Sequence, residues 1–386
     1  MRIPAPIADY AETLTAIRRD LHAHPELGFE EVRTAGVVAD KLREYGVDEI
    51  ETGIGKTGVV AVIKGSRPGR RIGLRADMDA LPIHEQTNLP YASKNAGVMH
   101  ACGHDSHTTM LLGAAKYLAE TRDFAGEAVL IFQPAEEGLG GARAMLADGL
   151  FDRFPVDEVY GLHNSPFDEP GQIGIKPGAA MAGANFFDIR ITGKGGHAAR
   201  PEGTVDALVV AAGLAREMHT IVSRNVPPTI PIVLSVTQLH AGAAYNVIPE
   251  DATLAGTVRY FDDATAELVS ERMREICAGY ATTHGAEIEI DIRNVFDVLR
   301  NDDALSGEML AAAIDIVGAD NARQKDEAVM GSEDFADMLA VVPGAYCTIG
   351  HAGDVPLHNP AFVLDDDILP LGATLMAKMV ETRGAA

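Results

Sequence analysis

The spacing of apolar residues changes along the chain, and each change predicts an element. From residue 7 to about residue 45 apolar positions recur at helical spacing, broken at His24 and ended by Gly46, so two helices are expected. A further helical stretch covers 106–120. Short apolar runs typical of strands cover 58–65, 71–79, 128–137 and 158–163. Strands that alternate with helices predict an α/β sheet covered on both faces.

A second, self-contained pattern begins near Ala184. Its order is strand, helix, strand, strand, helix, strand, over residues 185–193, 204–223, 230–239, 251–261, 263–284 and 287–294. This βαββαβ order is that of a ferredoxin-like unit. We therefore expect a mixed-sheet α/β catalytic domain formed by 1–183 and 295–386, with a ferredoxin-like satellite domain, 184–294, inserted into it.

Length and charge narrow the class of protein. A chain of 386 residues exceeds what one hydrophobic core usually organises, in agreement with two domains. The formal charge of -24 disfavours nucleic acids and anionic membranes as partners, so a small molecule is expected. The N-terminus is polar where a signal peptide needs an apolar run, and no segment has the length of a membrane span, which predicts a cytoplasmic protein. Three widely separated cysteines argue against a disulfide framework.

The densest cluster of reactive residue types is the segment MHACGHDSHTTM. It contains Cys102, His104, Asp105 and His107 at the start of a predicted helix. A thiolate and an imidazole two residues apart can both reach one side of a metal site. Asp105 can orient an imidazole ring without itself binding the metal. The alternative is an ordinary helix N-terminus with an aspartate cap.

Other polar groups follow predicted strands. Glu136 and Glu137 come after VLIFQP, where one carboxylate can bind a metal while the other removes a proton from water. The alternative for this pair is a solvated acidic turn. His163 closes EVYGLH and His358 lies in PLHNPAF, and a lone histidine in either place is more often structural than a ligand.

Five further residues have weaker signals. Asp77 and Asp79 would share one face of an extended segment and support a metal site, or form a salt-bridged turn. His197, in the glycine-rich GKGGHAARP, can donate to an oxyanion. Asn246 and Arg259 are candidate contacts for a substrate carboxylate, although a surface salt bridge is the common role of such an arginine.

Taken together and in order, these segments resemble the M20 metallopeptidase clan, and more closely its hippurate hydrolases and N-acyl-amino-acid amidohydrolases. The motifs are LHAHPELGFEE, LRADMDALPI, MHACGHDSHT, QPAEEGLGGA, GLHN, GKGGHAARP, YNVIPE, GTVR, MGSEDF and LHNPAF. The resemblance implies two divalent metal ions per subunit, and the mixture of thiolate, imidazole and carboxylate ligands admits Zn, Mn, Ni or Co. It implies that the ligands are Cys102, His104, Glu137, His163 and His358.

The resemblance also assigns roles outside the ligand set. Glu136 matches the general base, and His197 matches a histidine that the satellite domain offers to the active site, in many relatives across a dimer interface. The chain departs from the wider clan in having Asp77-Met78-Asp79 where the first metal motif is His-x-Asp. It also has Cys102 where many clan members have a bridging aspartate.

The function so implied is hydrolysis of the amide bond of an N-acyl amino acid, which gives a carboxylic acid and a free amino acid. Metal ions would activate a water, Glu136 would take its proton and His197 would stabilise the tetrahedral oxyanion. Three alternatives stay open. They are a metallo-dipeptidase of the same clan, a cysteine hydrolase with Cys102 as nucleophile and His104 or His107 as base, and a non-enzymatic metal-binding protein.

Overall fold

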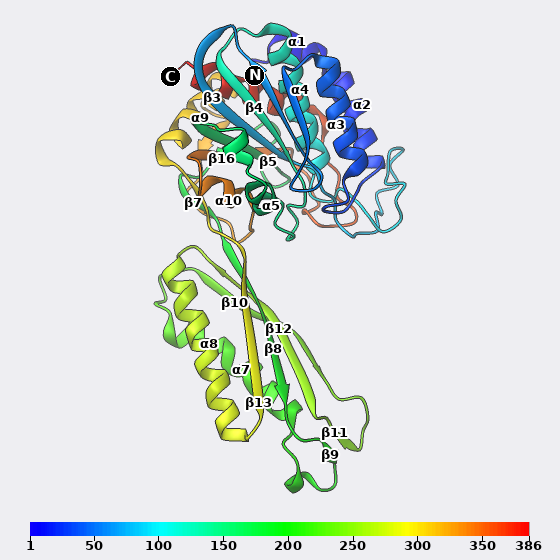
Figure 1. Cartoon of the computed structure of the whole chain (residues 1–386), viewed down its shortest axis with the longest axis vertical. Helices are drawn as coiled ribbons and strands as arrows, with labels where there is room; N and C mark the ends of the chain where they lie inside the picture. The colour runs from blue at the N-terminus through cyan, green and yellow to red at the C-terminus, as the bar shows by residue number, and fades with distance from the viewer. Residues whose placement is uncertain (386) are drawn as a thin grey trace. The chain divides into compact units, whose positions relative to one another are not determined.

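The computed structural model describes residues 1–385, which form two compact units (Figure 1). Unit 1 contains, of the residues described, Met1–Ala180, Leu299–Ala328 and residues 333–385. Unit 2 contains Met181–Val298 and the short segment Val329–Ser332. The expected satellite domain, 184–294, lies within unit 2, but the sequence does not indicate the returning segment 329–332.

Unit 1 is built on a mixed sheet of eight strands, as expected for its α/β class. In spatial order the strands are β1 (Glu49–Ile54), β2 (Gly58–Lys64), β4 (Ala125–Gln133), β3 (Arg67–Asp77), β5 (Glu158–Ser165), β16 (Gly344–Gly350), β6 (Ile173–Ile175) and β15 (Ala322–Gln324). The neighbours β4, β3, β5 and β16 run parallel, so their carboxyl ends meet at one edge of the sheet. Functional groups of α/β sheets gather at that edge.

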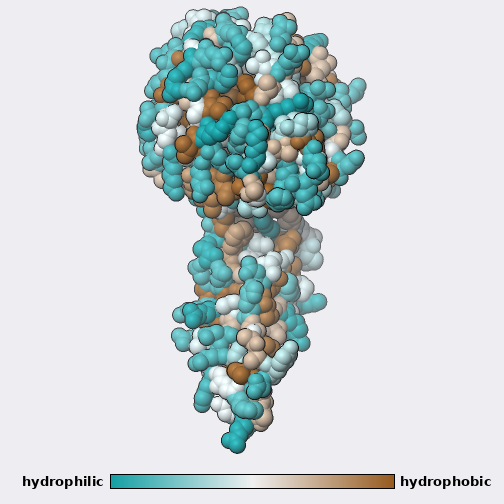
Figure 2. Space-filling model, turned by 90° about the vertical axis from the view of Figure 1, so that its right-hand side faces the viewer, coloured by the Kyte–Doolittle hydropathy of each residue, from teal (hydrophilic) through white to brown (hydrophobic). Residues whose placement is uncertain are grey.

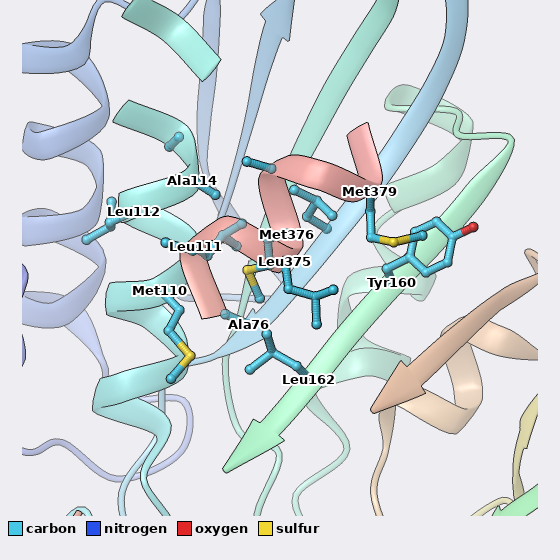
Figure 3. Packing of buried hydrophobic residues seen from close by; sticks show 14 of the residues in the cluster. Ala76, Met110, Leu111, Leu112, Ala114, Tyr160, Leu162, Leu375, Met376 and Met379 are labelled. Atoms are coloured by element: carbon cyan, nitrogen blue, oxygen red, sulfur yellow. The ribbon is translucent and has the colours of Figure 1, made fainter. Parts of the chain in front are cut away.

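Helices cover both faces of this sheet. The helices of unit 1 are α1 (Ala5–Asp9), α2 (Ala11–Ala23), α3 (Val32–Tyr45), α4 (His104–Thr121), α5 (Gly141–Ala147), α6 (Leu150–Arg153), α9 (Asp303–Val317), α10 (Phe335–Leu339) and α11 (Leu369–Arg383), with the 3-10 turn η2 (Asp366–Ile368). Figure 3 shows side chains of α4, α11 and the central strands packed together, including Met110, Tyr160 and Met376. The segment expected to hold two helices forms three, α1, α2 and α3. The additional one, α1, is a separate short helix.

Alternation along β3 shows how the two faces differ. Leu74 and Ala76 belong to the apolar core under α4 and α11. The residue between them, Arg75, therefore points to the opposite face, where its guanidinium lies 5.6 Å from the ring centre of Phe335 on α10. One face of the sheet is thus apolar, while the other holds a fully buried charge close to the site described below.

The expected strand over 128–137 is wrong in its last four residues. β4 ends at Gln133, because Pro134 has no backbone N–H to donate and Ala135 takes a left-handed conformation with φ 54°. Glu136 and Glu137 consequently lie on a turn, and the geometry of an extended strand does not set their directions.

Unit 2 has the ferredoxin-like order of elements that its sequence predicts. Its antiparallel sheet has the order β10 (Ile232–Ala241), β12 (Asp251–Tyr260), β8 (Gly183–Thr192) and β13 (Glu287–Phe296), and α7 (Ala207–Asn225) and α8 (Asp263–His284) pack against each other and against this sheet. Asp206 and Asp262 cap these helices through their side chains. The smaller elements are β9 (Gly196–His197), η1 (Pro201–Gly203) and β11 (Val247–Ile248) in unit 2, and β7 (Gly178–Met181) pairing with β14 (Leu299–Asn301).

The hydrophilic surface of unit 1 and the three free thiols agree with the charged, cysteine-poor composition. On the face drawn in Figure 2, hydrophilic residues predominate over unit 1, with scattered hydrophobic ones. Cys102, Cys277 and Cys347 are all buried and free, so the chain has no disulfide framework. Within residues 1–385, no helix is long and apolar enough to cross a membrane.

Candidate metal centre

The five residues expected to bind metal meet at the carboxyl edge of the unit 1 sheet. Cys102 and His104 lie where the loop after β3 leads into α4, Glu137 follows β4, His163 lies on β5 and His358 follows β16. Cys102 Sγ is 3.4 Å from His163 Nε2, and Glu137 Oε1 is 3.2 Å from His358 Nε2. His104 Nε2 lies 3.9 Å from Glu137 Oε1.

Within this cluster two groups of potential ligands share one thiol. The ligand atoms of Cys102, His104 and His163 lie within 4.8 Å of one another, and so do those of Cys102, Glu137 and His358. Two neighbouring three-ligand groups with a common thiol suit two metal ions that share Cys102 as a ligand. Mixed sulfur, nitrogen and carboxylate donors suit Zn and other first-row divalent metals.

The state of individual atoms also fits bound cations. His104 Nε2 is buried and has no hydrogen-bond partner, an arrangement that is unfavourable unless another group binds there. His163 donates from Nδ1 to the carbonyl of Asn164 at 2.7 Å, which leaves the lone pair of Nε2 free. Hydrogen bonds to Cys102 and Glu137 raise the pKa of His358 to about 10, so the cluster attracts positive charge.

Asp77 and Asp79 are buried beneath the cluster and contact different histidines. Asp79 Oδ1 lies 3.1 Å from His104 Nδ1, and its Oδ2 accepts the backbone N–H of Glu137 at 2.9 Å. Asp77 Oδ1 lies 2.6 Å from His107 Nδ1. The second nitrogen of His107 accepts the backbone N–H of Asn164 at 3.0 Å. His107 therefore has neither ring nitrogen free for a metal, whereas His104 has one.

The expected orienting role of Asp105 is wrong. Its carboxylate faces away from the histidines of the cluster, with Oδ2 2.7 Å from His22 Nδ1 and 3.0 Å from Arg18 Nε. Together these groups form a buried ion cluster that fastens the first turn of α4 to α2. The aspartates that do orient rings come from the end of β3.

Glu136 is buried next to the ligands among further carboxylates. An oxygen of Glu136 lies within 4.8 Å of one each from Glu333 and Asp334. Burial and the negative charges of Glu333, Glu137 and Asp334 hold the pKa of Glu136 well above its usual range. A carboxyl group with a raised pKa can hold a proton near neutral pH, as a group that takes and returns a proton must.

Arg75, Glu333 and Asp334 belong to the site's surroundings, although their roles were not assigned from the sequence. Arg75 donates to Asp77 Oδ2 at 2.7 Å, to Glu333 Oε1 at 2.8 Å and to Gln133 Oε1 at 2.8 Å. Gln133 in turn donates to Asp334 Oδ1 at 2.6 Å. One signal was available, because an arginine within a buried strand requires anionic partners. One of these partners, Glu333, lies 258 positions away, so that pairing has no local signal.

The three remaining candidate residues lie in unit 2, which is described by itself. His197 is exposed on β9 and pairs with Val247 on β11, and the carbonyl of Asn246 accepts the N–H of Ala198 at 3.1 Å, so His197 and Asn246 are neighbours. Ala199 N–H donates to His197 Nδ1 at 3.0 Å, which places the proton of the neutral ring on Nε2. Arg259, half-buried on β12, donates to Ser332 Oγ instead of forming the common surface salt bridge.

Comparison with known proteins places the chain among hydrolases of amide bonds that use metal ions. The model of peptidase family M20/M25/M40 matches residues 73–382. The chain is 44% identical over 379 residues to a hippurate hydrolase of Campylobacter jejuni, covering 98% of each chain. It is 40% identical over 368 residues to an N-acetylcysteine deacetylase of Bacillus subtilis, covering 95% of each. The chain belongs to the M20 peptidase family, and the resemblance in its motifs is confirmed.

A solved structure agrees with this assignment. A dinuclear metal-binding peptidase of the M20 family from Bacillus subtilis superimposes with a TM-score of 0.83 at 36% identity, covering 97% of this chain and 98% of the other. The mixed-sheet fold with an inserted domain is thereby confirmed as that of the family.

Proposed function

We propose that the protein hydrolyses the amide bond of N-acyl amino acids in a centre that holds two divalent ions. The observation that carries this proposal is the pair of three-ligand groups that share Cys102, with the buried carboxyl of Glu136 beside them. The names of its hippurate-hydrolysing and deacetylating relatives support the substrate class. The substrate panel described below is designed to identify the acyl group and the amino acid.

The residues of the chain have separate tasks in this reaction. Divalent ions held by Cys102, His104, Glu137, His163 and His358 would supply a water of lowered pKa and would polarise the amide carbonyl. Glu136 accepts the proton of the attacking water and later gives it to the departing amine. Asp79 and Asp77 hold His104 and His107, so that the ligand ring keeps one orientation. His197 donates from Nε2 to the developing oxyanion.

The structure gives little support to a cysteine hydrolase. Burial and the charge of Glu137 raise the pKa of the Cys102 thiol, whereas a nucleophile needs it lowered. Both nitrogens of His107 are engaged, so this ring is not available as the base. A purely structural metal site does not account for the buried Glu136 beside the ligands.

Substitution of the base tests the proposal. Metal-replete Glu136→Gln should retain its metal content and lose turnover of benzoyl-, acetyl- or indoleacetyl-amino acids by a factor of about 10²–10⁴. Near-wild-type turnover with metals bound would exclude Glu136 as the base. Dipeptides form the second arm of the substrate panel, and faster hydrolysis of dipeptides than of all acylated amino acids would favour a dipeptidase.

We further propose that two copies associate through unit 2 and that His197 acts in the site of the partner copy. β10 is an edge strand of its sheet and exposes Val233 and Leu239, and α7 exposes Leu208 and Val209. Exposed apolar residues on a free strand edge favour pairing with another chain.

Mixing inactive Glu136→Gln with inactive His197→Ala should restore activity, because a mixed dimer has one intact site. No recovery after subunit exchange would contradict action across the interface.

A further inference from the structure

Asn164 is a buried residue beneath the proposed metal centre whose side chain bonds to segments that carry ligands. It follows the ligand His163 near the end of β5 and is 1% exposed. Its side-chain amide donates from Nδ2 to the carbonyl of Cys102 at 2.6 Å. The amide oxygen, Oδ1, accepts from His351 Nε2 at 3.2 Å. A single side chain thus connects three segments that each carry a ligand.

The backbone of Asn164 extends this set of contacts. Its N–H donates to His107 Nε2 at 3.0 Å, and its carbonyl accepts from His163 Nδ1 at 2.7 Å. The first contact completes the chain of bonds from His107 to Asp77. The second fixes the tautomer in which His163 Nε2 can bind a metal.

The link through His351 reaches the most exposed ligand. His358 is about half exposed and lies on the loop that follows β16. That loop is fastened at His351, whose N–H donates to the carbonyl of Ser165 at 3.0 Å, and at His358, whose N–H donates to the carbonyl of Ala101 at 2.8 Å. Without the acceptor on Asn164, the side chain of His351 would lose its described hydrogen-bond partner.

We propose that Asn164 is a positioning residue of the metal centre, whose amide holds the thiol segment and the His358 loop at the spacing that two ions require. This inference rests on the proposed ligand set. The role demands an amide, because the side chain must donate to a carbonyl and accept from an imidazole at once. Aspartate of the same size cannot donate when ionised, and leucine can do neither.

Asn301 provides a matched control within unit 1. It too is a buried asparagine, 4% exposed, whose Nδ2 donates to the carbonyls of Lys176 and Tyr346 at 2.9 and 3.0 Å and whose Oδ1 accepts from Tyr346 N–H at 2.7 Å. None of its described bonds involves a residue of the metal centre. Loss of either amide should therefore lower the stability of the fold, but only loss of Asn164 should alter metal binding.

The experiment titrates Co²⁺ into the full chain after removal of metal, with absorption spectra and a competing chelator as readouts. Asn164→Leu and Asn164→Asp should bind Co²⁺ about 10–100-fold more weakly than wild type, with a changed thiolate-to-cobalt band. Asn301→Leu should match wild type in both readouts. If Asn164→Leu does not fold, the isosteric Asn164→Asp decides.

Two outcomes separate this inference from the proposed function. If wild type binds Co²⁺ and the Asn164 variants bind it with unchanged affinity and spectrum, the positioning role is wrong while the metal centre stands. If wild type itself shows no thiolate-to-cobalt band, the proposed ligand set fails, and with it both proposals. Equal weakening by Asn301→Leu would reduce Asn164 to a general structural role and overturn the inference.

Discussion

Cys102 is the residue on which the proposed centre depends most, because both three-ligand groups include it. Its environment argues for a ligand and against a nucleophile. The thiol faces His163 Nε2 at 3.4 Å, and burial raises its pKa, so a bound cation is what would stabilise the thiolate. A residue with this role can be replaced by another anionic ligand, whereas a nucleophilic cysteine cannot.

This difference gives a prediction at the residue scale. Cys102→Asp should retain metal and measurable hydrolysis, whereas Cys102→Ala should bind metal more weakly and lose hydrolysis, because only aspartate restores an anionic ligand. Structural Zn sites of four ligands bind with about 10–16 kcal/mol, or roughly 3 kcal/mol per ligand, so alanine should weaken metal affinity about a hundredfold. Metal content and initial rates of the two variants measure this. Equal inactivity of both variants with metal fully bound would instead support the nucleophile.

At the scale of elements, the start of α4 depends on one glycine. Gly103 adopts φ 89° immediately before His104, and a Cβ there would collide with Nδ2 of Asn164. The loop can therefore bring Cys102 and His104 to one side of the site only if this position has no side chain. The positions of Cys102 and His104 in the site therefore depend on a backbone conformation of Gly103 that few other residues allow.

Gly103→Ala should consequently destabilise the fold by roughly 1–3 kcal/mol and weaken metal binding, since it adds both strain and a steric clash. Gly36→Ala is the control, because Gly36 lies inside α3 with open space around its Cβ position. That change should stabilise by about 0.5–1 kcal/mol and leave the metal affinity unchanged. Chemical unfolding and Co²⁺ titration of both variants check the pair of expectations.

The C-terminal helix gives a pH-dependent prediction. Glu158, buried at the start of β5, accepts from Arg383 of α11 at 2.9 Å and contacts Arg70 at 2.7 Å. Burial tends to raise the pKa of Glu158, but its bonds to Arg383 and Tyr160 outweigh burial and lower it. A lowered pKa in the folded state means that the stabilisation is present above the ordinary carboxyl range and is lost as the pH falls through the lowered value.

Glu158→Gln should therefore be less stable than wild type at pH 7 by about 2 kcal/mol, the scale of a hydrogen bond to a charged group. The difference should shrink as the pH falls through the carboxyl range. Thermal unfolding of both proteins over a pH series measures it. A gap that stays constant or widens in acid would show that this ion pair does not stabilise α11.

Elements were easier to predict than the bonds between them. Periodicity gave the order of the main elements of unit 2 and of β2, β3, α4, β4 and β5 in unit 1, because burial of one face repeats along each element, but it assigned no element to residues 295–386. It misplaced the end of β4, where Ala135 takes a left-handed conformation that no spacing of apolar residues indicates. The bond from Arg75 to Glu333 and the partners of Asp105 depend on how distant segments meet, so the sequence left them unassigned or wrong.

At the scale of the whole molecule, the two units differ in what should stabilise them. The proposed ligands all lie in unit 1, whereas unit 2 has a core of its own around Leu214, Met218 and Val258. Ligands that bind only the folded state stabilise it by an amount set by their concentration relative to Kd. Metal should therefore act on the unfolding of unit 1 and leave that of unit 2 unchanged.

Differential scanning calorimetry of the full chain tests this. Metal at a hundred times its Kd contributes about 2.7 kcal/mol, so chelation should lower the unit 1 transition by roughly 5–10 °C. The unit 2 transition should stay in place, and Leu214→Ala, which removes a buried side chain at a cost of about 2–5 kcal/mol, should identify it. If chelation and Leu214→Ala lower the same single transition, the units unfold together, and the metal would then stabilise the whole chain as one cooperative structure.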